Sequence, residues 1–163
     1  MQITRASDYA VRVMIHLAGL PPSSTVRQVE LSRATEVSEH FLSKVLQQLV
    51  RARLIRSQRG AGGGYALAAS AASISLLDVL EAVEGPMRLN QCIEEGPSCD
   101  RKSWCPAHQV WAEAQAAITT VLGAASMASL AARAQGMSYE RHEKTVWISC
   151  VPRKLKEKRG RPN

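Results

Sequence analysis

Long apolar segments are missing from this chain of 163 residues: nowhere do about 18 apolar residues follow one another, as a membrane-spanning helix requires. The first residues also lack the basic segment, apolar run and cleavage site of a secretory signal. These two absences predict a cytoplasmic protein with no membrane partner. In that compartment thiols stay reduced, so a disulfide framework is not expected.

Aromatic residues are scarce at 4% of the chain, although hydrophobic residues make up 45%. This balance is common in helical proteins built on Ala, Leu and Val, and it differs from the composition of disordered chains. The length allows one good core, or one small domain with an appended dimerisation element.

Motifs that would indicate an enzyme are missing as well. The chain has no Cys-x-x-Cys redox pair, no His-Glu-x-x-His motif and no evident carboxylate–histidine group beside its cysteines. The glycine-rich residues 60–64 lack the Gly-Lys-Ser/Thr ending of a nucleotide-phosphate loop. We therefore expect a protein that is not an enzyme, with a small metal or redox enzyme as the less favoured class.

Basic charge is concentrated at the two ends of the chain, whose net charge is +7. Residues 1–67 hold nine Lys/Arg and four Asp/Glu, residues 68–140 hold four and eight, and residues 141–163 hold eight and two, giving +5, −4 and +6. A polyanion such as double-stranded DNA is the simplest partner for the N-terminal part. A solvated basic surface without a partner is the alternative.

Three helices are predicted in the N-terminal part. Ser7 is a candidate cap for a first helix over residues 7–19, and a capping-box pattern at residues 25–28 opens a short second helix. Ser38 caps a third helix, whose apolar stripe is Phe41, Leu42, Val45, Leu46 and Leu49. A short capped helix, a tight turn and a helix with a polar outer face indicate a helix-turn-helix, with a plain three-helix bundle as the alternative.

The outer face of the third helix supplies the candidate DNA-reading side chains. They are Ser38, His40, Ser43, Lys44, Gln47 and Arg51. Two strand candidates, residues 54–59 and 65–67, follow directly and are joined by a glycine-rich turn, so they predict a β-hairpin wing. The wing residues expected to contact the DNA backbone or minor groove are Arg59, Gly60, Gly62 and Gly63.

Three of the four cysteines, Cys92, Cys99 and Cys105, lie in residues 92–108. The Gly and Pro residues of this segment predict a loop. Thiolates suit zinc, copper(I) or an iron–sulfur cluster, and His108 adds a possible fourth donor. The wide cysteine spacing differs from that of most structural zinc sites and favours a cluster. A structural zinc site and a thiol-only redox switch remain alternatives.

A longer helix is predicted after Pro106, with an apolar seam at Trp111, Ala114, Ile118 and Val121. Because helices one to three are expected to supply the core, we predict that this seam packs on its copy in a homodimer, with packing inside one chain as the alternative. The chain then divides into a DNA-binding domain (residues 1–73), a cluster loop with dimerisation helix (74–135) and a basic, mobile tail (136–163) in which Cys150 has no assigned role.

Four features in this order resemble one family, the winged-helix transcription regulators that carry or have lost an iron–sulfur cluster, typified by IscR and NsrR. The features are residues 1–4 with residues 8–12, the wing at residues 59–65, residues 74–80, and three cysteines before a long helix. The resemblance covers residues 1–134. It implies a mainly α winged helix-turn-helix fold with a hairpin wing and a long dimerisation helix, and a homodimeric repressor or activator that binds a pseudo-palindromic operator. It also implies a 2Fe–2S or 4Fe–4S cluster near the dimer interface.

The resemblance supplies two candidates for the fourth cluster ligand. IscR-like members use a histidine placed like His108, and NsrR-like members use an aspartate placed like Asp8. The opening of this chain resembles the NsrR type more, so Asp8, which could come from the other subunit, is the preferred ligand. The physiological signal stays open between nitric oxide, redox state and iron supply.

Overall fold

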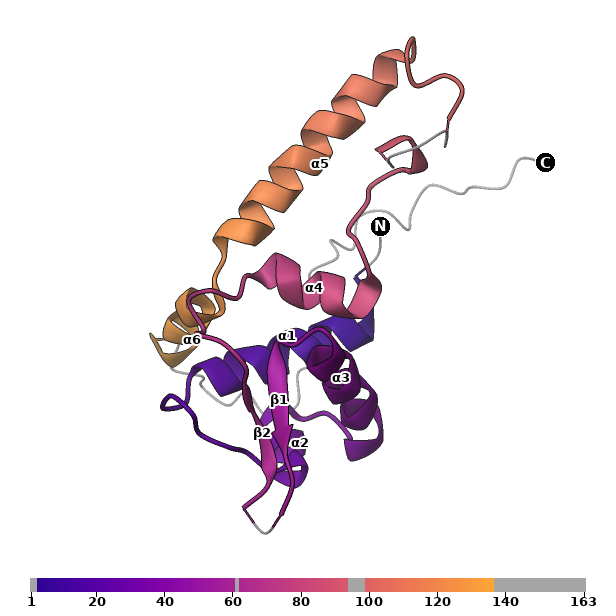
Figure 1. Cartoon of the computed structure of the whole chain (residues 1–163). Helices are drawn as coiled ribbons and strands as arrows, with labels where there is room; N and C mark the ends of the chain where they lie inside the picture. The colour runs from indigo at the N-terminus through magenta and orange to yellow at the C-terminus, as the bar shows by residue number, and fades with distance from the viewer. Residues whose placement is uncertain (1–2, 61, 94–98, 137–163) are drawn as a thin grey trace, which may run out of the picture.

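The computed structural model of the chain describes residues 3–60, 62–93 and 99–136 (Figure 1). The elements follow one another in the order α1 (Arg5–Ala18), α2 (Gln28–Thr35), α3 (Glu39–Arg51), β1 (Ile55–Gln58), β2 (Gly64–Leu67), α4 (Leu76–Glu84), η1 (Gln91–Ile93), α5 (Pro106–Ala124) and α6 (Met127–Gly136). Among these described residues, no helix has the length and apolar character needed to cross a membrane.

The core is built around α1 and α3. Val13, Met14 and Leu17 recur on one side of α1, and Leu42, Val45, Leu46 and Leu49 recur on one side of α3. All seven side chains are buried in one cluster. Since burying a large aliphatic side chain contributes roughly 1.5–3 kcal/mol, this stripe-to-stripe packing contributes strongly to the stability of the helix-turn-helix.

The wing is a two-stranded antiparallel hairpin, in which Ile55 pairs with Leu67 and Gln58 with Gly64. Ile55 is its buried anchor in the core, while the rest of β1 is exposed. Val26, just before α2, bridges to Tyr65 and so fixes β2 against the helices. The hairpin lies beside α2, and its tip extends away from the helices (Figure 1). This confirms the predicted wing.

Helix α4 begins with a capping box. The Ser75 hydroxyl accepts a hydrogen bond from the Asp78 N–H (3.1 Å), and the Asp78 carboxylate accepts one from the Ser75 N–H (2.8 Å). Such reciprocal bonds satisfy two amide groups that a helix start otherwise leaves unpaired.

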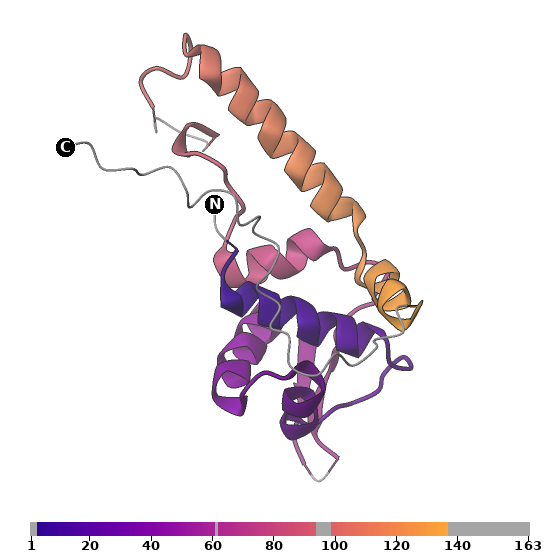
Figure 2. The same ribbon diagram turned by 180° about the vertical axis from the view of Figure 1, so that it is seen from behind.

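An arm, which we define as residues 85–124, projects from the core (Figures 1 and 2). Its described residues leave the core after Glu84, run through η1, resume at Cys99 and return along α5 to the beginning of α4. There the Leu76 N–H donates to the Ala125 carbonyl and the Met127 N–H donates to the Ile74 carbonyl, both at 2.8 Å. The arm and α4 therefore form a triangle, with α4 as its base.

Helix α6 closes the core on the outer side of α1. Met127 and Ala131 are buried, and the Gln135 amide donates to the carbonyl oxygen of Gly19 at 3.3 Å. The core therefore includes residues of α4 and α6, and it extends beyond the three N-terminal helices from which we expected it.

The first two helices begin elsewhere than the sequence patterns predict. Helix α1 starts at Arg5 after Thr4, so Ser7 lies inside the helix as a buried residue and does not cap it. Helix α2 starts after Arg27, whose N–H donates to the Glu30 carboxylate at 3.0 Å. Ser38 precedes α3 as predicted, but its side chain makes no capping hydrogen bond.

The basic tail from residue 137 onward, with Cys150, lies outside the described residues.

Candidate functional site

The polar face of α3 is open to solvent. The exposed members of the predicted set on or beside this helix are Ser38, His40, Lys44, Gln47 and Arg51. Ser43 is partly buried. Because residues three and four apart share one side of a helix, His40, Lys44, Gln47 and Arg51 form one strip of donors and acceptors.

The start of this strip is fixed by the turn between α2 and α3. The Gln28 side chain donates to the carbonyl oxygen of Glu39 (3.2 Å), and the Ser32 hydroxyl donates to the carbonyl oxygen of Val37 (2.6 Å). Glu36, with φ of 56°, makes the sharp reversal in the left-handed region. These contacts hold the first turn of α3 in one orientation relative to α2.

Phe41 differs from the prediction. It is 56% exposed, although the sequence pattern places it in the buried stripe. Its ring lies 6.3 Å from that of Tyr9 on α1 and 5.7 Å from that of His40, centroid to centroid. The stripe of α3 is therefore narrower than its pattern of apolar residues suggests, and an aromatic ring flanks the polar strip.

The wing tip combines exposed cations with glycine backbone. Arg59, Gly60 and Gly62 are exposed, and Gly63 is partly buried. Gly60 has φ of +109°, a conformation that side chains rarely adopt, and its carbonyl accepts the Gly63 N–H at 2.9 Å. Arg56 on β1 is also exposed and gives the wing a second cation. The predicted DNA-contacting residues do not include it.

The three cysteines of the arm are free and partly buried. Cys92 lies in η1 and Cys105 immediately precedes α5. Turns link the later part of the segment, where the Lys102 N–H donates to the Cys99 carbonyl (3.1 Å) and the Cys105 N–H donates to the Arg101 carbonyl (2.8 Å). Residues 94–98, between the first two cysteines, lie outside the described ranges. Within those ranges, no three Cys, His, Asp or Glu side chains are close enough together to hold a metal ion.

His108 lies in the first turn of α5, three residues after Cys105. Its Nδ1 atom is buried and has no hydrogen-bond partner in the described part of the chain. Buried polar atoms are normally paired, so an unpaired imidazole nitrogen beside a cysteine needs an explanation. Three thiols and one imidazole are donors that zinc and iron–sulfur clusters accept, and in donor chemistry the segment fits such a group.

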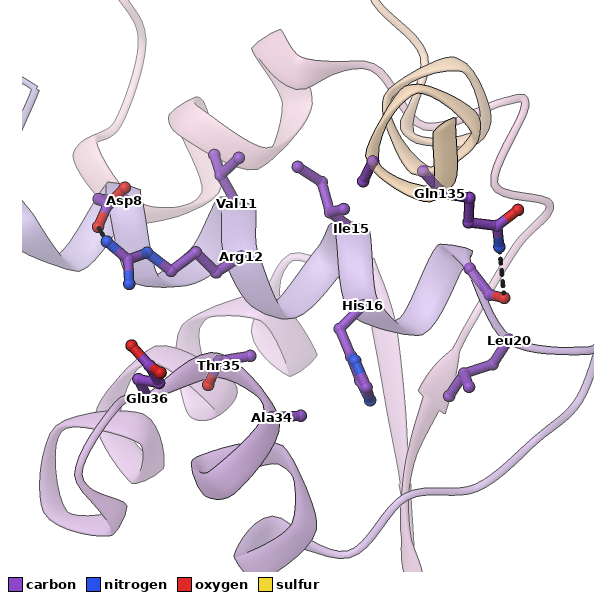
Figure 3. A pocket seen from close by; sticks show the side chains of 13 residues that line it. Asp8, Val11, Arg12, Ile15, His16, Leu20, Ala34, Thr35, Glu36 and Gln135 are labelled. Carbon is purple, nitrogen blue, oxygen red and sulfur yellow. Dashed lines mark hydrogen bonds and ion pairs between the residues drawn. The ribbon is translucent and has the colours of Figure 1, made fainter. Parts of the chain in front are cut away.

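Asp8 lies on α1 and not on the arm. Its carboxylate pairs with the Arg12 guanidinium at 2.8 Å, and about half of its side chain is exposed (51%). Both residues line a surface groove of about 930 Å³ between α1, the end of α2 and α6 (Figure 3). The groove is open to solvent. His16 also lines it, and partial burial lowers the pKa of His16 because the charged imidazolium is less well hydrated there.

Helix α5 buries none of its residues in the single chain. Val121 is 68% exposed and Trp111 40%, while Ala114 and Ile118 are partly buried. Val110, at 63%, extends the exposed apolar surface. This helix of 19 residues therefore leaves Val110, Trp111 and Val121 as exposed apolar surface in the single chain.

Comparison with known proteins gives one consistent result. The sequence profile of the Rrf2 family, described as an iron-dependent transcriptional regulator, matches residues 3–133. The chain is 31% identical over 130 residues to the HTH-type transcriptional regulator IscR of Vibrio vulnificus, covering 80% of this chain and 77% of that protein. It is 32% identical over 130 residues to the protein rrf2 of Nitratidesulfovibrio vulgaris, covering 80% and 87%.

Solved structures agree with this at the level of the fold. CymR of B. subtilis, the global cysteine regulator, superposes with a TM-score of 0.65 at 26% identity, over 82% of this chain and 98% of that one. The IscR structure from T. potens gives a TM-score of 0.67 at 23% identity, over 85% and 91%. The mainly helical winged helix-turn-helix fold is thereby confirmed. Most of the relatives are named as transcriptional regulators, which agrees with the prediction that the chain is not an enzyme.

Proposed function

The chain belongs to the Rrf2 family of iron-dependent transcriptional regulators, and from this we propose that it is a repressor whose operator affinity is controlled by an iron–sulfur cluster on the arm. The observation that carries the proposal is the donor set of the arm. It combines three free, partly buried thiols with one buried imidazole nitrogen that has no hydrogen-bond partner among the described residues, in the same chain as a helix-turn-helix with an open polar face.

In the proposed complex, the first turns of α3 enter a major groove. His40, Lys44 and Gln47 then face base edges, and Arg59 and the glycine tip of the wing follow the backbone or the minor groove. The small wing tip supports this arrangement, because backbone amides without side chains can approach phosphates closely.

The regulator acts as a homodimer on a pseudo-palindromic operator in this proposal. The uncovered apolar surface of α5 supports the dimer, since pairing with a second copy removes Trp111 and Val121 from water. Two helix-turn-helix units related by a two-fold axis would read two half-sites, which accounts for the pseudo-palindrome.

Cys92, Cys99 and Cys105 would hold the cluster, which when bound supplies a centre that reacts with nitric oxide, oxidants or changes in iron supply. For the fourth ligand we propose Asp8 of the second subunit. Its carboxylate is half exposed and borders an open groove, so a partner's arm can reach it. His108 is the alternative, favoured by its unpaired Nδ1.

Zinc is the second candidate for the same site. A Cys3His set is acceptable to zinc, and the unpaired nitrogen of His108 would complete it. A structural zinc ion would stabilise the arm, but the metal itself has no redox chemistry with which to sense a signal.

One purification tests the main proposal against zinc. The protein is isolated anaerobically, its visible absorption, iron, sulfide and zinc are measured, and operator binding is compared before and after exposure to nitric oxide. We expect a brown protein with thiolate-to-iron charge-transfer bands whose operator affinity changes on exposure. A colourless protein with one zinc per chain and unchanged affinity would reject the cluster.

A further inference from the structure

The side chain of Gln115 ties the two halves of the arm together. Its Oε1 atom accepts a hydrogen bond from the Leu89 N–H at 2.9 Å, and its Nε2 atom donates to the Met87 carbonyl at 2.8 Å. Both bonds are partly buried and cross 26 and 28 residues of sequence. One amide therefore pairs with the N–H of one backbone residue and the carbonyl of another, as a neighbouring β-strand would.

Met87 is held on its other side as well. Its N–H donates to the Glu81 carboxylate at 3.0 Å, while its carbonyl accepts from Gln115. The segment that leaves α4 is thus fixed to the last turns of α4 and to the middle of α5. Three residues after Leu89 comes Cys92, the first cysteine of the arm.

Gln115 belongs to the helix that starts directly after Cys105, the third cysteine. The segment before Cys92 and the helix after Cys105 are therefore joined by one side chain. We propose that Gln115 is the positioning residue of the thiol site, which fixes the supports of the first and third cysteines relative to each other before any ion or cluster binds. This inference rests on the proposed function of the cysteines as ligands.

Only an amide can make both bonds. A carboxylate of the same shape accepts from Leu89 but faces the Met87 carbonyl oxygen without a proton to donate. The substitution Gln115→Glu consequently breaks one bond and adds charge repulsion while it keeps the size of the side chain. Gln109→Glu is the matched control on the same helix, because Gln109 is exposed and its side chain donates to Glu113 on the same helix, not to the segment that leaves α4.

The test uses cobalt(II) as the probe, titrated into the reduced, metal-free chain of 163 residues and followed by thiolate-to-cobalt absorption. Residues that support metal ligands typically change metal affinity about tenfold to a hundredfold when altered, so we expect a loss of that size for Gln115→Glu. We expect Gln109→Glu to leave the cobalt affinity close to that of the unaltered chain. Equal affinities for the two variants would overturn the inference.

Cys92→Ser separates this inference from the proposed function. If it abolishes the cobalt signal while Gln115→Glu changes nothing, the thiol site stands and the role of Gln115 is wrong. If Cys92→Ser leaves the signal intact, the thiol site itself fails and the inference fails with it. If Gln115→Glu does not fold, the inference is tested by hydrogen exchange of the unaltered chain. We expect the Leu89 amide to be protected from exchange. Exchange at the rate of a free peptide would overturn the inference.

Discussion

The hydroxyl of Ser7 donates a hydrogen bond to the carboxylate of Glu84, and so joins the first turn of α1 to the last turn of α4. The Thr4 N–H donates to the same carboxylate oxygen at 3.2 Å. Ser7 is buried, whereas Glu84 is largely exposed. The contact ties the start of α1 to the point at which the arm leaves the core.

Removing the Ser7 hydroxyl is expected to weaken the fold in a pH-dependent way. The bonds from Ser7 and Thr4 lower the pKa of Glu84, since they favour its ionised form. Their contribution is complete above the ordinary glutamate pKa and is lost as the pH falls through the lowered value. Because the carboxylate is exposed, Ser7→Ala should lower the free energy of unfolding by only about 1 kcal/mol. Urea unfolding at neutral and acid pH measures this, and an equal loss at both would contradict it.

Substitutions on α3 and on the wing should affect DNA binding differently. Gln47→Ala removes a candidate base contact worth roughly 1–3 kcal/mol of discrimination, so it should change which operator is preferred. Arg59→Ala removes a candidate phosphate contact, so it should weaken all operators alike and reduce the slope of affinity against salt. Titrations of several operator sequences at different salt concentrations compare the two. Unchanged affinity and preference in both variants would exclude this face as the DNA-binding surface.

A charge at Val121 should separate the dimer. This side chain is 68% exposed in one chain, so Val121→Glu costs the monomer little, but it would bury a carboxylate in the proposed interface. We expect monomers by light scattering and much weaker operator binding. Ala116→Glu, on the opposite side of α5 by helical spacing, is the control and should stay dimeric. A monomeric unaltered protein with its cluster bound would refute the interface.

The fourth ligand can be assigned from three variants. If Asp8 is the ligand, Asp8→Ala should change the cluster spectrum and its sensitivity to nitric oxide, while His108→Ala changes them much less. Arg12→Gln is the control, because it removes the ion-pair partner of Asp8 but keeps the carboxylate. A surface ion pair at this spacing contributes only about 0.3–0.5 kcal/mol, so this variant should fold normally. Larger spectral changes in His108→Ala would transfer the role to His108.

Two glycines of the hairpin should tolerate alanine very differently. A Cβ atom at Gly64 would clash with the carbonyl of Val26, whereas one at Gly62 would meet nothing within 4 Å. We expect Gly64→Ala to cost about 1–3 kcal/mol of stability through overpacking, and Gly62→Ala to be close to neutral. Thermal unfolding of both variants measures the difference, and a neutral Gly64→Ala would mean that β2 can move away from Val26.

The parts of the fold that sequence alone predicts correctly are those with local signals. Helix α3 has an apolar stripe after Ser38. The hairpin follows from a glycine-rich turn between two short strand patterns. Each signal lies within a few residues of the structure that it determines.

The features that sequence alone misses depend on distant partners. Ser7 looks like a helix cap, yet its hydroxyl bonds to Glu84, which is 77 positions away. Gln115 gives no signal in the sequence, because its partners Met87 and Leu89 are backbone groups of another segment. Phe41 fits the apolar stripe of α3 but lies exposed at its edge, where its ring is near that of Tyr9 on α1. The predicted ligand set also stays a prediction, since pairing with a second chain would decide whether Asp8 reaches the cysteines.

The position of α6 on α1 has a consequence for how the protein is made. During synthesis α1 leaves the ribosome first, but Met127 and Ala131, which cover its outer side, follow more than a hundred residues later. Contacts between such distant segments form slowly, because a long loop must close before they stabilise anything. The nascent helix-turn-helix therefore exposes part of its apolar surface until α6 emerges, and chaperones have most opportunity to bind the chain in this interval.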